Sequence, residues 1–490
     1  MTSSGGGGAM QRLNPMDAQF VGAEDEDAHA SMAIACSAIF EGPAPSYREF
    51  IASVASRLDA APIFRRKLLT VPLNLGPPVW AEDPDFDLRY HVRQTALPTP
   101  GSDEQLGNLM ARVMGQRLDR DYPLWEYWLV EGLRRGRWAL ILKVHHAMVD
   151  GVAGTDLYRV LFDQSPEPSP QARGNLYSTG TMPTAGDGQA ARAPSSARLA
   201  YQAALDMAAL PARTALALNG ALAQPGDAIR RLARTVRATA KLAASVRPAV
   251  PSSLHGPIGR QRRYAWARAS LDDVKTIKRS LGGTVNDVVL AAATSGFRDV
   301  LLSRGEEPSP HMVPSLIPVS LRTSGQECSY ENRVSLLVAD LPVHVAEPAD
   351  RLATVRAEMS ALKEAHGPSA AQALVALGHY TPYPLAALVV RLGYRLPQRD
   401  IVTVTTNVPG PAEPLYGLGR KLVEIIPYVP IATTLRTGVS ILSYCGNLTF
   451  GITADYDTTP DIDVMVHGIE RGITDLLKAA GLSQAAAGPK

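Results

Sequence analysis

The chain has 490 residues, of which 46% are hydrophobic and 20% charged, and its formal net charge at pH 7 is +2. This length suits two or three globular domains, and the nearly balanced charge offers no sign of a nucleic-acid partner. The three cysteines, Cys36, Cys328 and Cys445, are scattered and show no CxxC spacing. They exclude a disulfide framework and a zinc site of the common spacing, and they fit a reducing cytoplasm.

Neither a signal peptide nor a membrane-spanning segment is predicted. Residues 1–10 are rich in Gly and lack the cationic start and apolar core of a signal peptide, so we expect a flexible leader. No apolar run approaches the roughly 20 residues of a spanning helix. The closest, residues 385–390, ends at Arg391. Any membrane contact is therefore expected to be peripheral.

The first half alternates between helix and strand signals. Residues 11–30 are polar with scattered apolar positions, and residues 68–101 are loop-rich because they contain many prolines. The predicted elements are a strand over 31–41, an amphipathic helix over 47–58, a helix over 103–118 capped by Ser102, two strands over 121–130 and 138–144 that form a hairpin, and a helix over 156–162.

Composition changes after Gln164. Residues 165–195 are rich in Pro, Gly, Ser and Thr, which is typical of a linker, and residues 196–247 are Ala-rich and favour helix. The second half is predicted to contain strands over 263–269, 312–321, 333–341, 401–407, 422–429, 438–444 and 448–456, and helices over 285–302 with Thr284 as N-cap, 349–365, 369–378 and 461–479. We therefore expect an α/β (α+β) protein with mixed or antiparallel sheets.

Residues 144–151 read Val-His-His-Ala-Met-Val-Asp-Gly and follow the apolar run 138–144, which is typical of a buried strand. Adjacent strand residues point to opposite faces, so one of His145 and His146 can face a cleft while the other faces the fold. Histidine is suited to proton transfer near neutral pH. Asp150 can orient a histidine or brace the loop, and Gly151 permits a tight turn. The segment predicts an acid–base centre.

Two non-catalytic roles for this segment compete with the acid–base centre. One is a packed histidine pair at a strand end. The second is a metal site, but adjacent histidines on a strand diverge, and no nearby Cys or His at i+4 completes a ligand set. We therefore expect no metal.

A basic helix is predicted within the linker, over residues 227–247. Cations at positions 230, 234, 237 and 241 line a face beside an apolar stripe. Two interpretations remain open. The helix either connects the halves with a solvated face or rests on a surface of anionic lipid.

Several segments together resemble one family. His145-His146-Ala147-Met148-Val149-Asp150-Gly151 matches the HHxxxDG motif of CoA-dependent acyltransferases, and Pro123-Leu124-Trp125, Asn286-Asp287 and Asn407-Val408-Pro409-Gly410-Pro411 narrow the match. The opening Leu13-Asn14-Pro15-Met16-Asp17 agrees as well. With these motifs in this order, the chain resembles the bacterial wax ester synthase/diacylglycerol acyltransferase family, which includes triacylglycerol synthases.

The resemblance implies two chloramphenicol-acetyltransferase-like halves, over residues 11–164 and 263–490, joined by a linker over 165–262, with the active site in a tunnel between them. It implies acyl-CoA as donor substrate, diacylglycerol or a long-chain alcohol as acceptor, no separate cofactor, and peripheral attachment to the inner face of the membrane or to lipid droplets. By resemblance His146 is the general base, His145 and Gly151 belong to the same motif, and Asp150 is mainly structural.

Direct transfer to an alcohol needs a base for its proton and a donor for the oxyanion that forms on the thioester carbonyl. Asn286, Thr405 or Thr406 can serve as that donor, although Asn286 can equally be a hydrogen-bonding residue at a helix start. Residues 407–410 are interpreted as a shaped loop and Trp125 as a core residue. The alternatives to an acyl-CoA-dependent enzyme are a condensation-type acyltransferase using carrier-protein thioesters and a non-catalytic lipid-surface protein.

Overall fold

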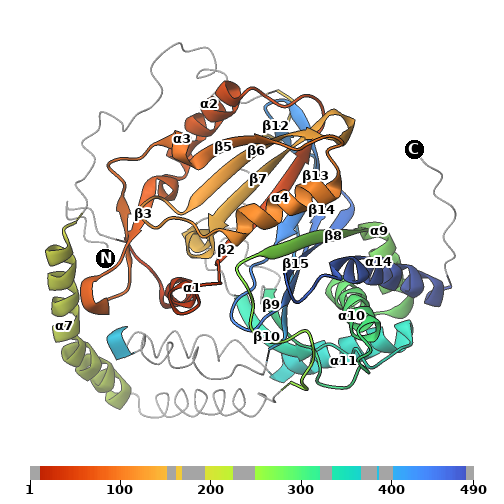
Figure 1. The fold of residues 1–490 in the computed structure, drawn as a ribbon. Coiled ribbons are helices and arrows are strands. Elements are labelled where there is room, and N and C mark those ends of the chain that lie inside the picture. The colour runs from red at the N-terminus through yellow and green to blue at the C-terminus, as the bar shows by residue number, and fades with distance from the viewer. Residues whose placement is uncertain are drawn as a thin grey trace.

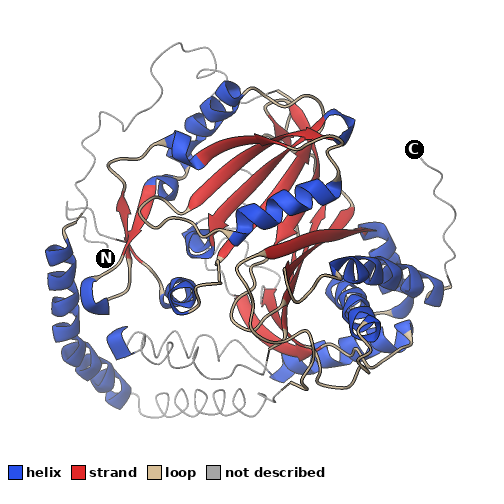
Figure 2. Cartoon of the chain, viewed as in Figure 1, coloured by secondary structure: helices blue, strands red, loops and turns tan. Residues whose placement is uncertain are grey.

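The structure is a computed structural model that describes residues 11–151, 162–167, 194–223, 249–320, 334–365, 383–385 and 401–481. Two six-stranded mixed sheets form its framework (Figures 1 and 2). The first sheet contains, in spatial order, β12 (Tyr416–Gly417), β13 (Arg420–Tyr428), β2 (Ala33–Phe40), β7 (Arg137–His145), β6 (Trp125–Leu133) and β5 (Val92–Ala96). The second contains β10 (Val334–Asp340), β9 (Pro314–Ser320), β11 (Thr403–Val408), β14 (Thr437–Tyr444), β15 (Asn447–Asp455) and β8 (Arg262–Ser270).

Helices and a small sheet cover this framework. The helices are α1 (Pro15–Glu26), α2 (Tyr47–Arg57), α3 (Leu88–His91), α4 (Asp103–Gly115), α7 (Ser196–Ala223), α9 (Leu271–Leu281), α10 (Val285–Ser303), α11 (Pro348–Ala365) and α14 (Ile462–Ala479). Five short 3-10 turns are η1 (Leu58–Ala60), η2 (Pro62–Arg65), η3 (Pro72–Asn74), η4 (Arg134–Gly136) and η5 (His146–Gly151). The small sheet joins β1 (Gln11–Arg12), β4 (Val79–Glu82) and β3 (Arg66–Leu69).

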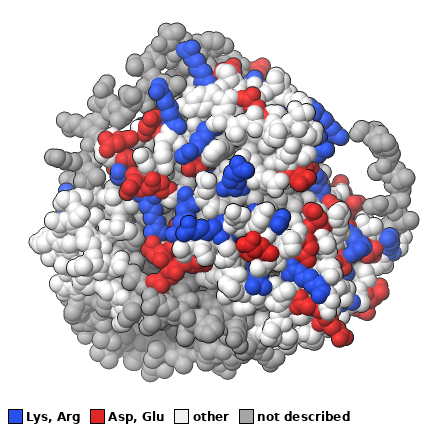
Figure 3. Space-filling view, viewed as in Figure 1, with Lys and Arg blue, Asp and Glu red and all other residues white. Residues whose placement is uncertain are grey.

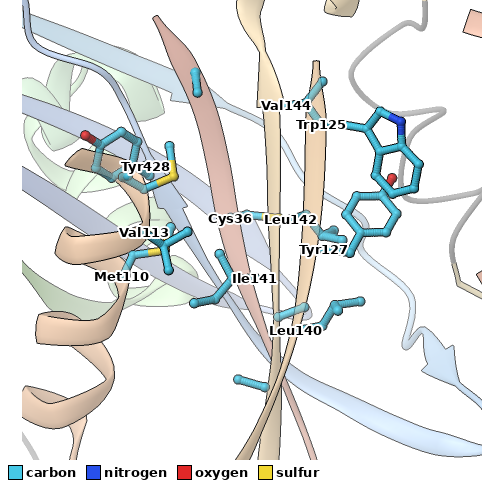
Figure 4. Close-up of a cluster of buried hydrophobic side chains, with 14 of the residues drawn as sticks. Cys36, Met110, Val113, Trp125, Tyr127, Leu140, Ile141, Leu142, Val144 and Tyr428 are labelled. Atoms are coloured by element: carbon cyan, nitrogen blue, oxygen red, sulfur yellow. The ribbon is translucent and has the colours of Figure 1, made fainter. Parts of the chain in front are cut away.

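The core of the first half lies on both faces of its sheet. Figure 4 shows Trp125 and Tyr127 on one side, and Met110 and Val113 of α4 on the other. All four side chains are buried. This two-sided burial explains why the 138–144 run does not alternate and is apolar at every position except Lys143, whose Nζ donates to the carbonyls of Val113 and Gln116.

Most predicted elements are confirmed. The predicted hairpin forms from β6 and β7 around η4, Ser102 caps α4, and Thr284 caps α10. Both sheets are mixed, because β5 runs parallel to β6 and β11 runs parallel to β14 and β9. The predicted helices over 156–162 and 369–378 and the basic helix over 227–247 fall wholly or almost wholly outside the described residues.

Two stretches contain elements that the sequence analysis does not predict. Residues 11–30 contain the helix α1, whose buried face carries Asp17, Val21 and Glu24. Two carboxylates on the inner face hide the apolar period that normally signals a helix. Residues 68–101 are not only loop, because β4, α3 and β5 lie within them.

The two sheets are joined by strand exchange. Strand β13 follows β11 of the second sheet in the chain but pairs with β2 of the first. Gly451 of β15 lies beneath it, and a Cβ at this position would stand 1.8 Å from the Pro427 carbonyl oxygen. Only glycine permits so close an approach of the two strands. The first half is therefore completed by residues from beyond 400.

Candidate active site

The histidine pair sits where β7 ends. His145 is the last residue of β7 and pairs with Ala33 of β2, and His146 opens the turn η5. The His145 side chain is buried at 1% exposure, whereas His146 is partly exposed. The predicted divergence of the two side chains agrees with this difference: one faces the fold and the other is accessible.

Hydrogen bonding fixes the tautomer of His145. The Ala147 N–H donates to His145 Nδ1 at 3.1 Å, so Nδ1 carries a lone pair and the proton resides on Nε2. Nε2 faces Glu24 Oε1 at 3.5 Å. With one nitrogen occupied by a donor and the other protonated, His145 has no lone pair free to accept a substrate proton.

His146 is held through its backbone and by ring stacking. Its N–H donates to the Met32 carbonyl at 3.0 Å, and its ring stacks on Phe20 of α1 with centroids 3.8 Å apart and planes 27° from parallel. An aromatic contact of this kind limits rotation of the imidazole. The partly exposed ring of His146 is therefore oriented before any substrate arrives.

Helix α1 supplies two residues that the sequence analysis missed. Phe20 and Glu24 are four residues apart, on one face of the helix, and they meet His146 and His145 respectively. The Glu24 carboxylate also accepts the Met32 N–H at 2.6 Å and an Arg120 N–H at 3.2 Å. Burial alone would raise its pKa, but His145, Met32 and Arg120 together lower the pKa of Glu24. The acid-rich sequence of α1 is the signal that could have identified Glu24 as a candidate residue.

The motif ends in the turn η5. Asp150 and Gly151 are its last two residues, so they lie on the same short turn as His146. The bracing contact predicted for the Asp150 side chain lies outside what the structure describes and stays a prediction.

The Asn286 and Asn407 motifs, far apart in sequence, meet in the second half. Asn407 at the end of β11 donates from Nδ2 to Asn286 Oδ1 at 3.2 Å. The helix-start role belongs instead to Thr284 and Asp287, which form the capping box of α10. Asn286 is therefore not the capping residue, and its amide is oriented by Asn407.

The other candidate oxyanion donors, Thr405 and Thr406, lie on opposite faces of β11. Thr405 is buried, and its Oγ1 accepts a hydrogen bond from Ser315 Oγ at 2.9 Å. Thr406 lies on the opposite face of β11 from Thr405 and Asn407. Asn286 is half-buried, and with its oxygen engaged by Asn407 its NH₂ group is left to donate.

Trp125 is a core residue, as predicted. Its side chain is buried and its Nε1–H donates to the Phe64 carbonyl at 2.8 Å. Its ring stacks on His91, 4.5 Å away between centroids. The Pro123-Leu124-Trp125 motif thus anchors the start of β6 beside the end of β7, where Trp125 pairs with Val144.

A shallow hollow lies under α2, towards the opposite end of β7 from the histidines. Trp138 and Leu140 of β7 line it together with Phe40 of β2 and Phe50 of α2. Leu140 is five residues from His145, or about 17 Å along an extended strand. This hollow is therefore separate from the reaction centre.

Comparison with known proteins identifies the family of this chain. Residues 13–289 match the family model described as the wax ester synthase/diacylglycerol acyltransferase catalytic domain, and residues 330–477 match the WS/DGAT C-terminal domain. Together the two matches cover well over half of the chain. They define the protein as an acyltransferase, and the chain belongs to the wax ester synthase/diacylglycerol acyltransferase family.

Individual relatives are similar over nearly their full length. The probable diacylglycerol O-acyltransferase tgs1 of Mycobacterium tuberculosis is 40% identical over 468 residues, which is 96% of each chain. The wax ester synthase/diacylglycerol acyltransferase of Marinobacter aquaeolei VT8 is 26% identical with a TM-score of 0.65, covering 96% of this chain and 100% of that one. The trichothecene 15-O-acetyltransferase of Fusarium sporotrichioides, 13% identical with a TM-score of 0.59 over 97% of each chain, shares the fold.

Proposed function

We propose that the protein transfers the acyl group of acyl-CoA to the hydroxyl of diacylglycerol, with His146 as general base. The bonding of His145 carries this assignment: its Nδ1 accepts the Ala147 N–H, so His146 is the histidine of the pair that is positioned to accept a proton. Family membership and the names of the mycobacterial relatives support the substrates.

In the proposed reaction His146 takes the proton of the acceptor hydroxyl as its oxygen attacks the thioester carbonyl. The tetrahedral intermediate carries an oxyanion, to which the Asn286 NH₂ group can donate. The C–S bond then breaks, and the protonated imidazole returns its proton to the departing CoA thiolate. The balance is one ester and one CoA thiol for each thioester and alcohol consumed. This scheme needs no cofactor beyond the acyl-CoA substrate, and that absence remains a prediction.

General-base catalysis by His146 is expected to accelerate the transfer about 10²–10⁴-fold. The general test is a purified-enzyme assay in which labelled acyl-CoA is offered diacylglycerol and a long-chain alcohol in competition. Triacylglycerol as the main product supports the proposal, and wax ester as the main product would reassign the acceptor. Transfer only from a carrier-protein thioester, or no transfer at all by folded protein, would favour the condensation-type or the non-catalytic alternative.

We also propose peripheral contact with a lipid surface, on the cytoplasmic side of the membrane or on lipid droplets. None of the described helices is long and apolar enough to cross a membrane. The basic helix over 227–247 remains a prediction because it lies outside the described residues.

Among the described residues, an apolar patch on α7 and η3 supports this contact. Leu73 is 87% exposed, and Tyr201 and Leu205 are also exposed. The helix packs beside η3, where Ala203 meets Gly76. Figure 3 shows the surface over α7, at the left, as largely uncharged. Exposed apolar groups gathered in this way are typical of a protein that meets lipid or another apolar surface.

Vesicle flotation separates the contribution of the apolar patch on α7 and η3 from that of the predicted basic helix over 227–247. Changing Leu73, Tyr201 and Leu205 to Ser should weaken binding to neutral vesicles containing diacylglycerol. Changing Arg230, Arg234, Arg237 and Lys241 to Gln should weaken the salt-sensitive binding to anionic vesicles. Binding that neither set alters would contradict the proposed surface.

A further inference from the structure

Glu24 stands at the junction of the histidine pair, yet it is a buried acid outside every motif of the sequence. Its side chain is 2% exposed, on an N-terminal helix more than 100 residues before His145. Taking a carboxylate out of water is unfavourable unless hydrogen bonds and charges compensate. Met32 N and Arg120 Nη2 donate hydrogen bonds to it, and His145 Nε2 faces its Oε1 at 3.5 Å without forming a hydrogen bond.

Two of these partners lead directly to the histidines. Through Oε1, Glu24 faces His145 Nε2, and through the same oxygen it accepts the Met32 N–H. The Met32 carbonyl in turn accepts the His146 N–H at 3.0 Å. One carboxylate oxygen is thus linked to the ring of the first histidine and, across one residue, to the backbone of the second.

The tautomer of His145 follows from this arrangement. An acceptor facing Nε2 favours the tautomer that carries its proton there, which leaves Nδ1 free to accept the Ala147 N–H at 3.1 Å. The opposite tautomer would point an Nδ1–H at the Ala147 N–H and leave a lone pair facing a carboxylate. That tautomer would break the hydrogen bond that ties the residue after His146 to the strand.

We infer that Glu24 is a positioning residue for the acyl transfer: it fixes the Nε2–H tautomer of His145, which in turn fixes the turn that carries His146. Phe20, one turn earlier on the same helix, completes the arrangement by stacking on the His146 ring. This role rests on the proposed function of His146, but the tautomer can be measured without any assay of activity.

The experiment uses the full-length protein with ¹⁵N-labelled histidine. In the wild type, the His145 resonances, assigned by their loss in His145→Asn, should show a protonated Nε2 and an unprotonated Nδ1. A wild-type His145 with its proton on Nδ1 would overturn the inference whatever the variants do.

Two substitutions and a matched control extend the test. Glu24→Gln keeps an acceptor oxygen, so the tautomer should persist and kcat should fall by no more than about threefold. Glu24→Leu removes the acceptor, so His145 should lose its single tautomer and kcat should fall at least about tenfold, with KM for acyl-CoA within about twofold. Asp25→Leu is the control, because Asp25 also pairs with Arg120, at 2.6 Å, but is half-exposed.

The outcomes are distinguishable. Folded Glu24→Leu protein with the wild-type tautomer and the kcat of the Asp25→Leu control would contradict the positioning role. Loss of the tautomer in Glu24→Gln as well would show that the charge of Glu24, and not only its acceptor oxygen, fixes the tautomer, and would still support the positioning role. An active His146→Ala enzyme would refute His146 as the base. The tautomer of His145 is measured independently of activity, so that result would not be affected.

Discussion

At the scale of single residues, the two histidines of the motif have different surroundings. Substituting each by alanine is therefore predicted to affect activity and stability differently. His146→Ala should lower kcat/KM by about 10²–10⁴ and leave a folded protein, because the ring is partly exposed and its loss removes the base. His145→Ala should lower activity less but destabilise the fold by roughly 2–4 kcal/mol, because it leaves the Ala147 N–H without its acceptor and removes the buried ring that faces the Glu24 carboxylate.

Steady-state kinetics and thermal melting of the two variants test this division. Equal loss of activity in both, at unchanged melting temperature, would contradict it. The sequence predicts the pair and the different burial of its two members, although His146 lies in the turn η5 and not in the strand from which the divergence is predicted. It does not predict Phe20 and Glu24, which come from a helix over 100 residues away and reach the pair only through the fold.

His91 offers a prediction on pH. Its ring lies between Phe86 and Trp125, and burial lowers the pKa of His91 to about 4. The unfolded chain takes up this proton near pH 6.5, so stability falls as the pH drops from about 6.5 to about 4. Chemical denaturation should show a loss on the order of 3 kcal/mol from this residue across that window.

The comparison variant is His91→Phe, which keeps the stacked ring but cannot be protonated. Its unfolding free energy should be lower at pH 7, because the hydrogen bond from Nδ1 to the Trp125 carbonyl is lost, and it should depend less on pH between 6.5 and 4. A wild type and a variant with the same pH dependence would show that His91 does not contribute to acid sensitivity.

At the scale of elements, the end of β11 and the start of α10 act as one unit through Asn407 and Asn286. Because Asn407 is expected to act only by orienting Asn286, the two should be strongly coupled. Asn407→Leu should lower kcat about tenfold in the wild type and less than twofold in an Asn286→Ala background.

A double-mutant cycle on kcat measures this coupling. Additive losses would mean that Asn407 acts independently of Asn286, as a loop residue alone. The sequence predicts only a shaped loop over residues 407–410, since nothing in local periodicity shows that β11 ends beside the start of α10.

The elements themselves are predictable to different degrees for physical reasons. The β6–β7 hairpin and the caps of α4 and α10 depend on neighbouring residues, so pattern and capping signals locate them. Sequence patterns do not predict helix α1, because its inner face carries Asp17 and Glu24. The burial of these two acids is explained only by partners such as Arg120. The pairing of β13 with β2 is not predicted either, because the local sequence of a strand carries no signal for which distant strand it pairs with.

At the scale of the whole molecule, the exchange of β13 joins the halves, and Gly451 of β15 lies where the second sheet closely approaches β13 of the first. A Cβ there would meet the Pro427 oxygen at 1.8 Å and the Tyr264 hydroxyl at 2.6 Å. Gly451→Ala should therefore destabilise the protein by about 3 kcal/mol or more, or prevent folding.

Gly22→Ala is the matched control, because Gly22 lies within α1 and a Cβ there meets nothing within 4 Å. The same chemical change should then stabilise by roughly 0.5–1 kcal/mol. Thermal or urea unfolding measures both. A Gly451→Ala protein as stable as Gly22→Ala would contradict the close crossing of the two sheets.

Direct transfer, with His146 as base and no acyl-enzyme, is the step on which the proposed function depends. Its most direct test is to mix the enzyme with labelled acyl-CoA alone and follow free CoA and protein mass, then add diacylglycerol. No burst of CoA and no acylated protein should appear before the acceptor, steady release should begin on its addition, and His146→Ala should abolish that release. A stoichiometric CoA burst that leaves acylated enzyme, which then yields triacylglycerol at the steady-state rate, would contradict direct transfer.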